Sequence, residues 1–185
     1  QAFVWYRRAA DGGNTFARFN LGQIYLFGTG VSIDHATAAK WFRLAADQGH
    51  ATAQLNLGFL YFVGRGVERD IATALSWYRR AAQQGERDAQ VNLANLLYSG
   101  APDVAADDDA PDDASAAAVG TQLETRARVT IDHAAAARWY RRAAEAGFPP
   151  AQVELGRMYQ KGEGLARDPV QAVAWYRQAA ESGFP

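Results

Sequence analysis

The sequence predicts an all-α solenoid, in which antiparallel helix hairpins of 36 residues stack one after another. The first observation is the spacing of the five tryptophans, because three of the four intervals between them are 36 residues and the fourth is 62. A fixed period of about 20–50 residues is typical of repeated supersecondary units. The second observation is that each period holds two stretches of helical apolar spacing, separated by a Gly-x-Gly turn. The tryptophans are Trp5, Trp41, Trp77, Trp139 and Trp175.

The first half of each unit is predicted to be a helix. Ala53, Leu57 and Tyr61 are four residues apart and therefore share one face of such a helix. Gly58 lies beside them, although glycine costs a helix interior about 1 kcal/mol relative to alanine. We therefore expect a neighbouring helix to cross there too closely for a side chain. The recurring glycines are Gly22, Gly58 and Gly156.

A turn and a second helix follow in each unit. Gly64 is predicted to end the first helix in the left-handed conformation, and Gly66 permits the reversal after it. A phosphate-binding loop would need a preceding strand, which the pattern does not provide. Asp70 is predicted to cap the second helix, which carries Trp77 and Tyr78 on its apolar stripe as core residues. The capping residues are Asp34, Asp70, Asp132 and Asp168, and the glycines that close the second helices are Gly13, Gly49, Gly85, Gly147 and Gly183.

The full pattern is A-x-x-x-L-G-x-x-Y-x-x-G-x-G-V-x-x-D-x-x-x-A-x-x-W-Y-x-x-A-A-x-x-G, and it resembles the Sel-one-like repeat, a relative of the tetratricopeptide repeat. This resemblance implies a right-handed solenoid that serves as a protein-interaction scaffold in bacterial signalling, envelope assembly or host contact. The chain begins in mid-pattern, and we expect it to be a fragment of a longer protein. We predict one domain over 1–185, with a half repeat over 1–13 and repeats over 14–49, 50–85, 86–147 and 148–185.

The third full repeat departs from the pattern. Ala94 stands in place of the helix glycine and Leu97 in place of the tyrosine. Gly100 matches the first glycine of the turn and Val129 the valine after it, so an insertion is predicted over about 101–128. Its first half is rich in aspartate and is typical of a solvated loop. It lacks the ligand spacing of an EF-hand, and it is therefore interpreted as a tolerated spacer or a partner-specific feature.

Composition excludes several classes of function. The net charge is −1, with 19 basic and 20 acidic residues, which argues against a nucleic-acid or membrane-surface binder. The chain has no cysteine, which excludes disulfides and cysteine-ligated zinc. No apolar run approaches the ~18 residues of a membrane helix. No Ser-His-Asp or H-E-x-x-H arrangement occurs, so we expect no enzyme, no catalytic residue, no cofactor and no metal site.

The resemblance to tetratricopeptide repeats implies where a partner protein or peptide would bind. In that family the residue before the Leu-Gly pair faces the concave groove, and here it is asparagine in three units. An asparagine offers both a donor and an acceptor to a peptide backbone. The alternative is that these asparagines tie adjacent helices together, and it stays open. The candidate partner-binding residues are Asn20, Gln23, Phe27, Asn56, Phe59, Asn92, Asn95, Glu154 and Arg157.

The leading hypothesis is a scaffold that binds a partner protein or peptide in this groove. The alternatives are a regulatory repeat segment of a larger enzyme and a glycan- or lipid-binding module. Solenoid ends without polar capping helices expose core faces, so we also expect self-association through the ends near Trp5 and Phe184. The sequence leaves the compartment open between the periplasm or envelope and the cytoplasm of a bacterium.

Overall fold

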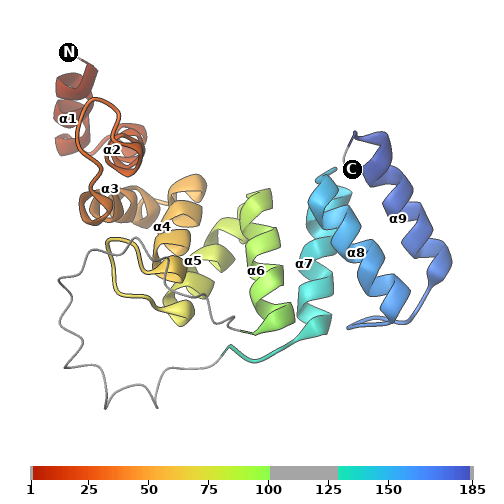
Figure 1. Ribbon diagram of the computed structural model, residues 1–185. Helices are drawn as coiled ribbons and strands as arrows, with labels where there is room; N and C mark the ends of the chain where they lie inside the picture. Colours follow the sequence, from red (N-terminus) through yellow and green to blue (C-terminus); the bar gives the residue numbers. More distant parts are fainter. Residues whose placement is uncertain (1, 101–128, 184–185) are drawn as a thin grey trace, which may run out of the picture.

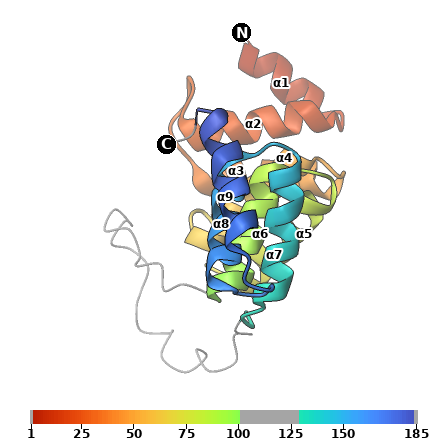
Figure 2. The ribbon, with the colours of Figure 1, turned by 90° about the vertical axis from the view of Figure 1, so that its right-hand side faces the viewer.

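The computed structural model describes residues 2–100 and 129–183, and in this part of the chain every regular element is an α-helix. The helices follow one another along a curved array, with α1 at one end and α9 at the other (Figure 1). Each helix packs against its neighbours in sequence. Figure 2 views the array from its C-terminal end, with α8 and α9 in front. The predicted all-α solenoid is confirmed. The helices are α1 (Ala2–Asp11), α2 (Thr15–Phe27), α3 (His35–Asp47), α4 (Ala51–Val63), α5 (Ile71–Gln83), α6 (Arg87–Ser99), α7 (His133–Glu145), α8 (Pro149–Lys161) and α9 (Pro169–Glu181).

The helices alternate between two roles. We call α2, α4, α6 and α8 the first helices and α3, α5, α7 and α9 the second helices, because each first helix forms a hairpin with the second helix that follows it. α1 has the sequence of a second helix and packs against α2.

The first-helix glycines mark the places where the two helices of a hairpin cross closely. A Cβ atom on Gly58 would lie 2.8 Å from Cδ1 of Tyr78, and one on Gly22 would lie 2.5 Å from Cδ1 of Phe42. The third glycine meets the ring of the last hairpin in the same way. The aromatic ring beside each tryptophan thus occupies the space of the missing side chain, which confirms the predicted close crossing.

The turn between the helices is built as the sequence predicts. Gly64 has a φ of 80° and ends α4, and the side chain of Asp70 accepts hydrogen bonds from the Thr73 N–H at 3.1 Å and hydroxyl at 2.6 Å. A Cβ atom on Gly66 would lie 2.2 Å from the carbonyl carbon of His35. The turn of one repeat therefore packs on the second helix of the repeat before it. All four predicted aspartate caps are observed, at Asp34, Asp70, Asp132 and Asp168.

The tryptophans differ in burial along the array. Trp41 belongs to a core cluster with Ala10 and Leu21, so it packs backward against the preceding repeat. Trp77 is also buried, at 7% exposure. Trp5 is 68% exposed, so the predicted core role is wrong for this residue. Trp139 and Trp175 are half-buried.

A buried glutamine at the start of the first helices joins successive hairpins, and the sequence reasoning missed it. Gln54 is 1% exposed, and its Nε2 donates to the carbonyl of Ala46 at 3.0 Å. Carbonyls in the last turn of a helix have no intrahelical partner, so this bond satisfies one of them at the end of α3. Arg18 takes the same position in α2, and its Nε donates to the Ala10 carbonyl at 3.1 Å. The corresponding pairs further along are Gln90 with Ala82 and Gln152 with Ala144, both at 3.2 Å.

The predicted insertion over about 101–128 lies outside the described residues. On either side of it the chain follows the pattern of the other repeats. The Asp132 N–H donates to the Leu97 carbonyl at 2.7 Å, as the Asp70 N–H donates to the Tyr61 carbonyl at 2.9 Å. The described residues that flank the insertion, Gly100 and Val129, therefore lie close together. Among the helices of the described residues, none has the length and apolar character needed to cross a bilayer.

Candidate interaction surface

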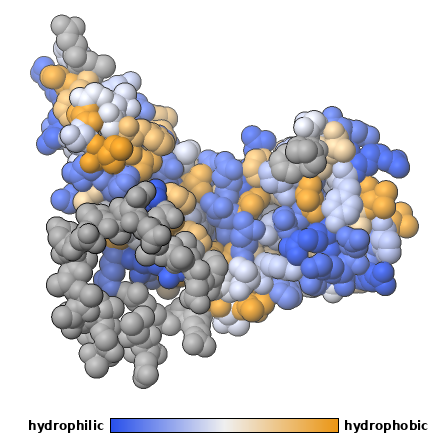
Figure 3. Space-filling view, viewed as in Figure 1, coloured by the Kyte–Doolittle hydropathy of each residue, from blue (hydrophilic) through white to orange (hydrophobic). Residues whose placement is uncertain are grey.

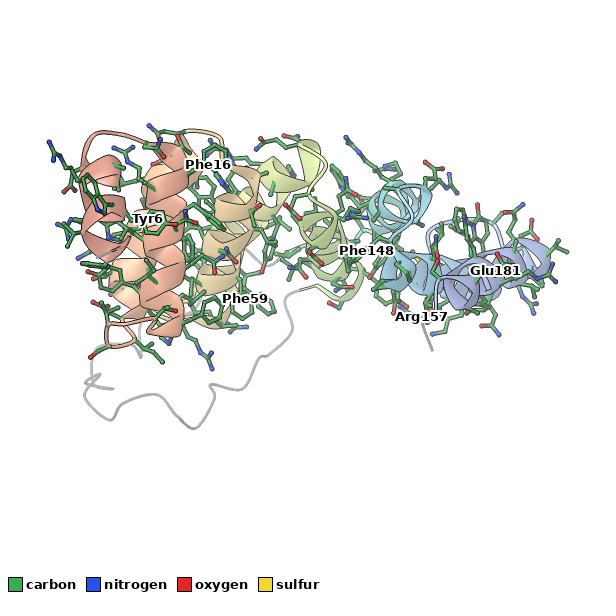
Figure 4. All side chains as sticks on the ribbon, turned by 90° about the horizontal axis from the view of Figure 1, so that it is seen from above. Tyr6, Phe16, Phe59, Phe148, Arg157 and Glu181 are labelled. Carbon is green, nitrogen blue, oxygen red and sulfur yellow. The ribbon has the colours of Figure 1, made fainter. Side chains whose placement is uncertain are left out.

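Large apolar side chains are exposed on the first helices. We call the side chains of α2, α4, α6 and α8 that do not pack into the hairpins the first-helix face. Phe16 is 69% exposed, Phe27 67% and Phe59 43%. Figure 3 shows hydrophobic residues gathered over the N-terminal helices, and Figure 4 shows Phe59 and Arg157 along the same side of the array. Exposed apolar surface of this kind is typical of binding surfaces.

The α2–α4 half of the first-helix face is aromatic and carries little charge. The ring of His50 stacks on Phe19 with centroids 4.5 Å apart and meets Phe16 edge-on at 5.4 Å. Its Nδ1 accepts a hydrogen bond from the Ala53 N–H at 3.2 Å, so the imidazole also caps α4. Burial lowers the pKa of His50, which keeps the ring neutral. α4 itself contains no Asp, Glu, Lys, Arg or His.

The α6–α8 half carries a polar network instead. The guanidinium carbon of Arg157 lies 4.6 Å from the ring centroid of Tyr98, and Nη1 donates to the Tyr98 hydroxyl at 2.9 Å. Nη2 of Arg157 donates to Oε2 of Glu154 at 2.6 Å. The Tyr98 hydroxyl in turn donates to Glu163 in the turn after α8. We call these four residues the Arg157 cluster.

The charges of the Arg157 cluster stabilise one another. The Tyr98 hydroxyl holds the pKa of Glu163 below its ordinary value, with help from Lys161 and Arg157. Burial alone would lower the pKa of Arg157, but its hydrogen bonds to Glu154 and Tyr98 outweigh burial and raise it. The side chains of Arg157 and Glu154 are 30% and 34% exposed. Arg157 is therefore paired within the cluster, and Lys161, whose Nζ lies 3.8 Å from Oε1 of Glu163, balances the second carboxylate.

A hollow of about 120 Å³ lies between the two halves, at the junction of α4 and α6. Tyr78 of α5 contributes to its wall, and burial raises the pKa of this phenol, so the hydroxyl stays protonated. Oδ1 of Asn95 accepts a hydrogen bond from the Tyr140 hydroxyl. The residues that line the hollow are Phe62, Tyr78, Asn92, Asn95, Leu96 and Ser99.

The predicted binding residues fall into separate groups. Glu154 and Arg157 are brought together in the Arg157 cluster, and Asn92 and Asn95 line the hollow. Nδ2 of Asn56 is buried, and it finds no hydrogen-bond partner in the described part of the chain. The remaining candidates, Asn20, Gln23, Phe27 and Phe59, lie on α2 and α4, where Asn20 and Gln23 are half-buried and Phe27 and Phe59 are exposed.

The outer surface of the second helices is rich in arginine, and these side chains lie over aromatic rings. The guanidinium of Arg80 is 4.5 Å from the ring centroid of Trp77, and that of Arg43 is 5.5 Å from Tyr61. Such cation–π contacts contribute roughly 0.5–1 kcal/mol at exposed sites. The arginines therefore cover the edges of the core. Among residues 2–100 and 129–183 there is no group of three or more His, Asp or Glu side chains able to hold a metal ion.

Comparison with known families gives the repeat an identity. The Sel1 repeat profile matches residues 1–14, 15–50, 51–86, 87–110, 115–148 and 149–184. The chain belongs to the Sel1 repeat family. Sel1 repeats are generally protein-interaction modules, and the fold is generally a non-catalytic scaffold. No protein of curated function matches the chain.

Solved structures of Sel1 repeat proteins are similar to this chain. One is a protective antigen of uropathogenic Escherichia coli, with 34% identity and a TM-score of 0.80 over 98% of this chain and 33% of the antigen. Another is a Sel1 repeat protein from Oxalobacter formigenes, with 32% identity and a TM-score of 0.76 over 98% of this chain and 62% of the other. The chain thus spans one third to three fifths of the length of these proteins. An immunity protein from Pseudomonas aeruginosa, at 20% identity, shares the fold, with a TM-score of 0.53 over 91% of this chain and 53% of that protein.

Proposed function

We propose that this chain binds a peptide segment of a partner protein along the first-helix face. The observation that carries the proposal is the exposure of Phe16, Phe27 and Phe59 on the first helices. On α3, α5 and α7, arginines instead pack over tryptophan and tyrosine rings, and Leu44 is the one large apolar side chain exposed on these three helices. Aromatic residues are enriched at binding surfaces because they bury a large apolar area with few rotatable bonds.

The asparagines support the same proposal. Nδ2 of Asn56 is a buried donor with no hydrogen-bond partner among the described residues. Leaving a buried donor unsatisfied costs about 1–3 kcal/mol, so rotation of this amide outward to a peptide carbonyl on the face would be favourable. Asn20 and Asn92 occupy the same repeat position in α2 and α6. A row of amides one repeat apart suits an elongated peptide backbone.

The test is a selection of peptides from a random 12-residue library on the whole chain, followed by affinity measurements on variants. Phe27→Ala combined with Phe59→Ala is expected to weaken the selected peptides at least 30-fold, since hot-spot aromatics contribute about 2 kcal/mol or more. Leu44→Ala is the matched control, because Leu44 is 42% exposed on α3. Equal losses of peptide affinity in both variants, or a loss only with Leu44→Ala, would show that peptides do not bind the first-helix face.

The exposed ends support self-association as a second mode of contact. Val4 and Trp5 are 67% and 68% exposed on α1, and Val170 and Val173 are 78% and 55% exposed on α9. Light scattering at increasing concentration is expected to show a rising mass that Trp5→Gln reduces. A constant monomer mass would contradict this expectation. The other predicted end residue, Phe184, lies outside the described residues.

The biological setting is proposed from the relatives alone. The Escherichia coli relative is a protective antigen, which favours a role for the present chain in the bacterial envelope or in host contact. Fractionation of the source cells would test this proposal. Recovery only with the cytoplasm would contradict an envelope role.

A further inference from the structure

The junctions between successive first helices differ at one repeat position. This position is held by Phe59 in α4, Asn95 in α6 and Arg157 in α8. Phe59 is large and half exposed, and Arg157 extends over the ring of Tyr98. Asn95 is the shortest of the three, and the hollow lies beside it.

A hydrogen bond explains why Asn95 does not fill this space. Its Oδ1 accepts from the hydroxyl of Tyr140, a phenol of the following second helix that is 1% exposed. The side chain is thereby held by α7, and its Nδ2 is left as a donor for another group. Ser99 is also held, because its hydroxyl donates to the Asn95 carbonyl at 2.7 Å. The width of the hollow is therefore fixed by internal hydrogen bonds.

The residues that line the hollow determine which kind of side chain can bind there. The lining contains three apolar or aromatic side chains, two amides and a hydroxyl, and none of these groups is charged at neutral pH. A charged group would lose its hydration there without gaining a counter-ion. An apolar protein cavity of about 150 Å³ admits a benzene molecule, so a hollow of about 120 Å³ suits a smaller, aliphatic side chain.

We infer that the hollow between α4 and α6 is the anchor site of the first-helix face and accepts one uncharged aliphatic side chain of a bound peptide, such as leucine, isoleucine, valine or methionine. The inference rests on the proposed peptide-binding function. The amides of Asn92 and Asn95 lie on the same wall and bind the backbone on either side of the anchor. An anchor surrounded by polar groups is typical of binding hot spots.

The experiment uses the whole chain and small probes that carry one side chain between two peptide bonds. N-acetyl-leucine N-methylamide, at millimolar concentration, is expected to shift the side-chain amide NMR signals of Asn92 and Asn95. The lysine and glutamate counterparts are expected to shift them at least ten-fold less. Asn95→Phe, which places the ring of Phe59 at this position, is expected to abolish the leucine effect. Ser76→Phe adds the same ring on the exposed side of α5 and is expected to leave it unchanged.

The results that would overturn the anchor site differ from those that would overturn the proposed peptide-binding function. Absence of a leucine-dependent shift, an equal shift with lysine, or persistence in Asn95→Phe would overturn the inference. If Asn95→Phe lowers the melting temperature sharply, Ser99→Leu narrows the hollow from the next turn of α6 and is expected to give the same loss. Selected peptides that depend on Phe27 and Phe59 but not on Asn95 would leave the proposed function standing and remove only the anchor site.

Discussion

In the α2–α4 half of the first-helix face, the repeat position of Phe59 presents a ring that is 43% exposed. In the α6–α8 half the same position holds Arg157, whose hydrogen bonds are made to Tyr98 and Glu154 within the chain. The first half leaves its apolar surface open, whereas the second half satisfies its own charges. The outer hairpins of the two halves share their framework, since a capping aspartate begins and a glycine follows both α3 and α9. In this solenoid the packing residues repeat while the face residues vary, so binding is expected to concentrate in the open half.

The largest expected effect concerns the helix crossing beneath each half. Gly58→Ala would place a methyl group 2.8 Å from the Tyr78 ring, and overpacking of this kind costs about 1–3 kcal/mol. The α6 repeat already carries Ala94, which is fully buried, so Ala94→Gly is expected to cost only about 0.5–1 kcal/mol of helix propensity. Urea unfolding of both variants measures the difference. A neutral Gly58→Ala would show that the crossing in the open half is not tight.

The next prediction concerns the asparagines at one repeat position of the first helices, Asn20, Asn56 and Asn92. Asn56→Ala combined with Asn92→Ala is expected to weaken the selected peptides by about 5–150-fold, because each of the two lost hydrogen bonds contributes about 0.5–1.5 kcal/mol. The melting temperature is expected to change little. Unchanged affinity with a sharply lowered melting temperature would instead show that these amides tie helices together.

The Arg157 cluster is expected to contribute to stability and not to peptide binding. Tyr98→Phe removes the hydroxyl that joins Arg157 and Glu163, at a cost of about 0.5–1.5 kcal/mol in the free energy of unfolding. The affinity for selected peptides is expected to stay within two-fold. A large loss of affinity would mean that the closed half also takes part in recognition.

The smallest expected effect is on the pH dependence of stability, which differs between the two halves of the first-helix face. Burial lowers the pKa of His50 below 6.5, so the unfolded chain binds more protons at this site and stability falls as the pH drops below the unfolded value. The lowered pKa of Glu163 contributes stability that is present above its ordinary value of 4.5 and is lost as the pH falls through the lower, folded value. Melting from pH 7 to 3 is expected to show the first loss near pH 6 and the second below pH 4.5.

Two variants test which residue causes each of these losses of stability. His50→Asn keeps a capping side chain, since Asn14 caps α2 at the same repeat position, and is expected to remove the loss near pH 6. Glu163→Gln is expected to reduce the loss at lower pH, and the remainder belongs to Asp34, whose pKa is lowered by its hydrogen bonds to Thr37. Persistence of the upper transition in His50→Asn would assign it to another group.

Much of the scaffold could be predicted from the sequence because its causes are local. The aspartate caps, the turn glycines and the helix glycines each depend on backbone conformation or on one neighbouring ring, and all recur at the tryptophan period. The buried Gln54 was missed because a polar residue on an apolar face gives no signal until its carbonyl partner on the preceding helix is known, although its recurrence at Gln90 and Gln152 was visible.

The side chains of the first-helix face were harder to predict than the helices and turns that carry them. The resemblance indicated the groove positions, and Glu154 and Arg157 were among them. Their pairing with Tyr98 and Glu163 depends on contacts between different repeats, which no local pattern encodes. The hollow beside Asn95 likewise arises from a bond to Tyr140, 45 residues away in sequence.

The central claim is that partners bind the first helices and not the second. A photo-crosslinking residue, p-benzoylphenylalanine, placed at Phe59 or at Leu44 tests it directly with the selected peptides. Both positions are exposed to a similar degree, at 43% and 42%, on the first and second helices respectively. If peptides bind the first helices, a crosslinked adduct is expected at position 59 and little at position 44. Efficient crosslinking at position 44 with none at position 59 would contradict it.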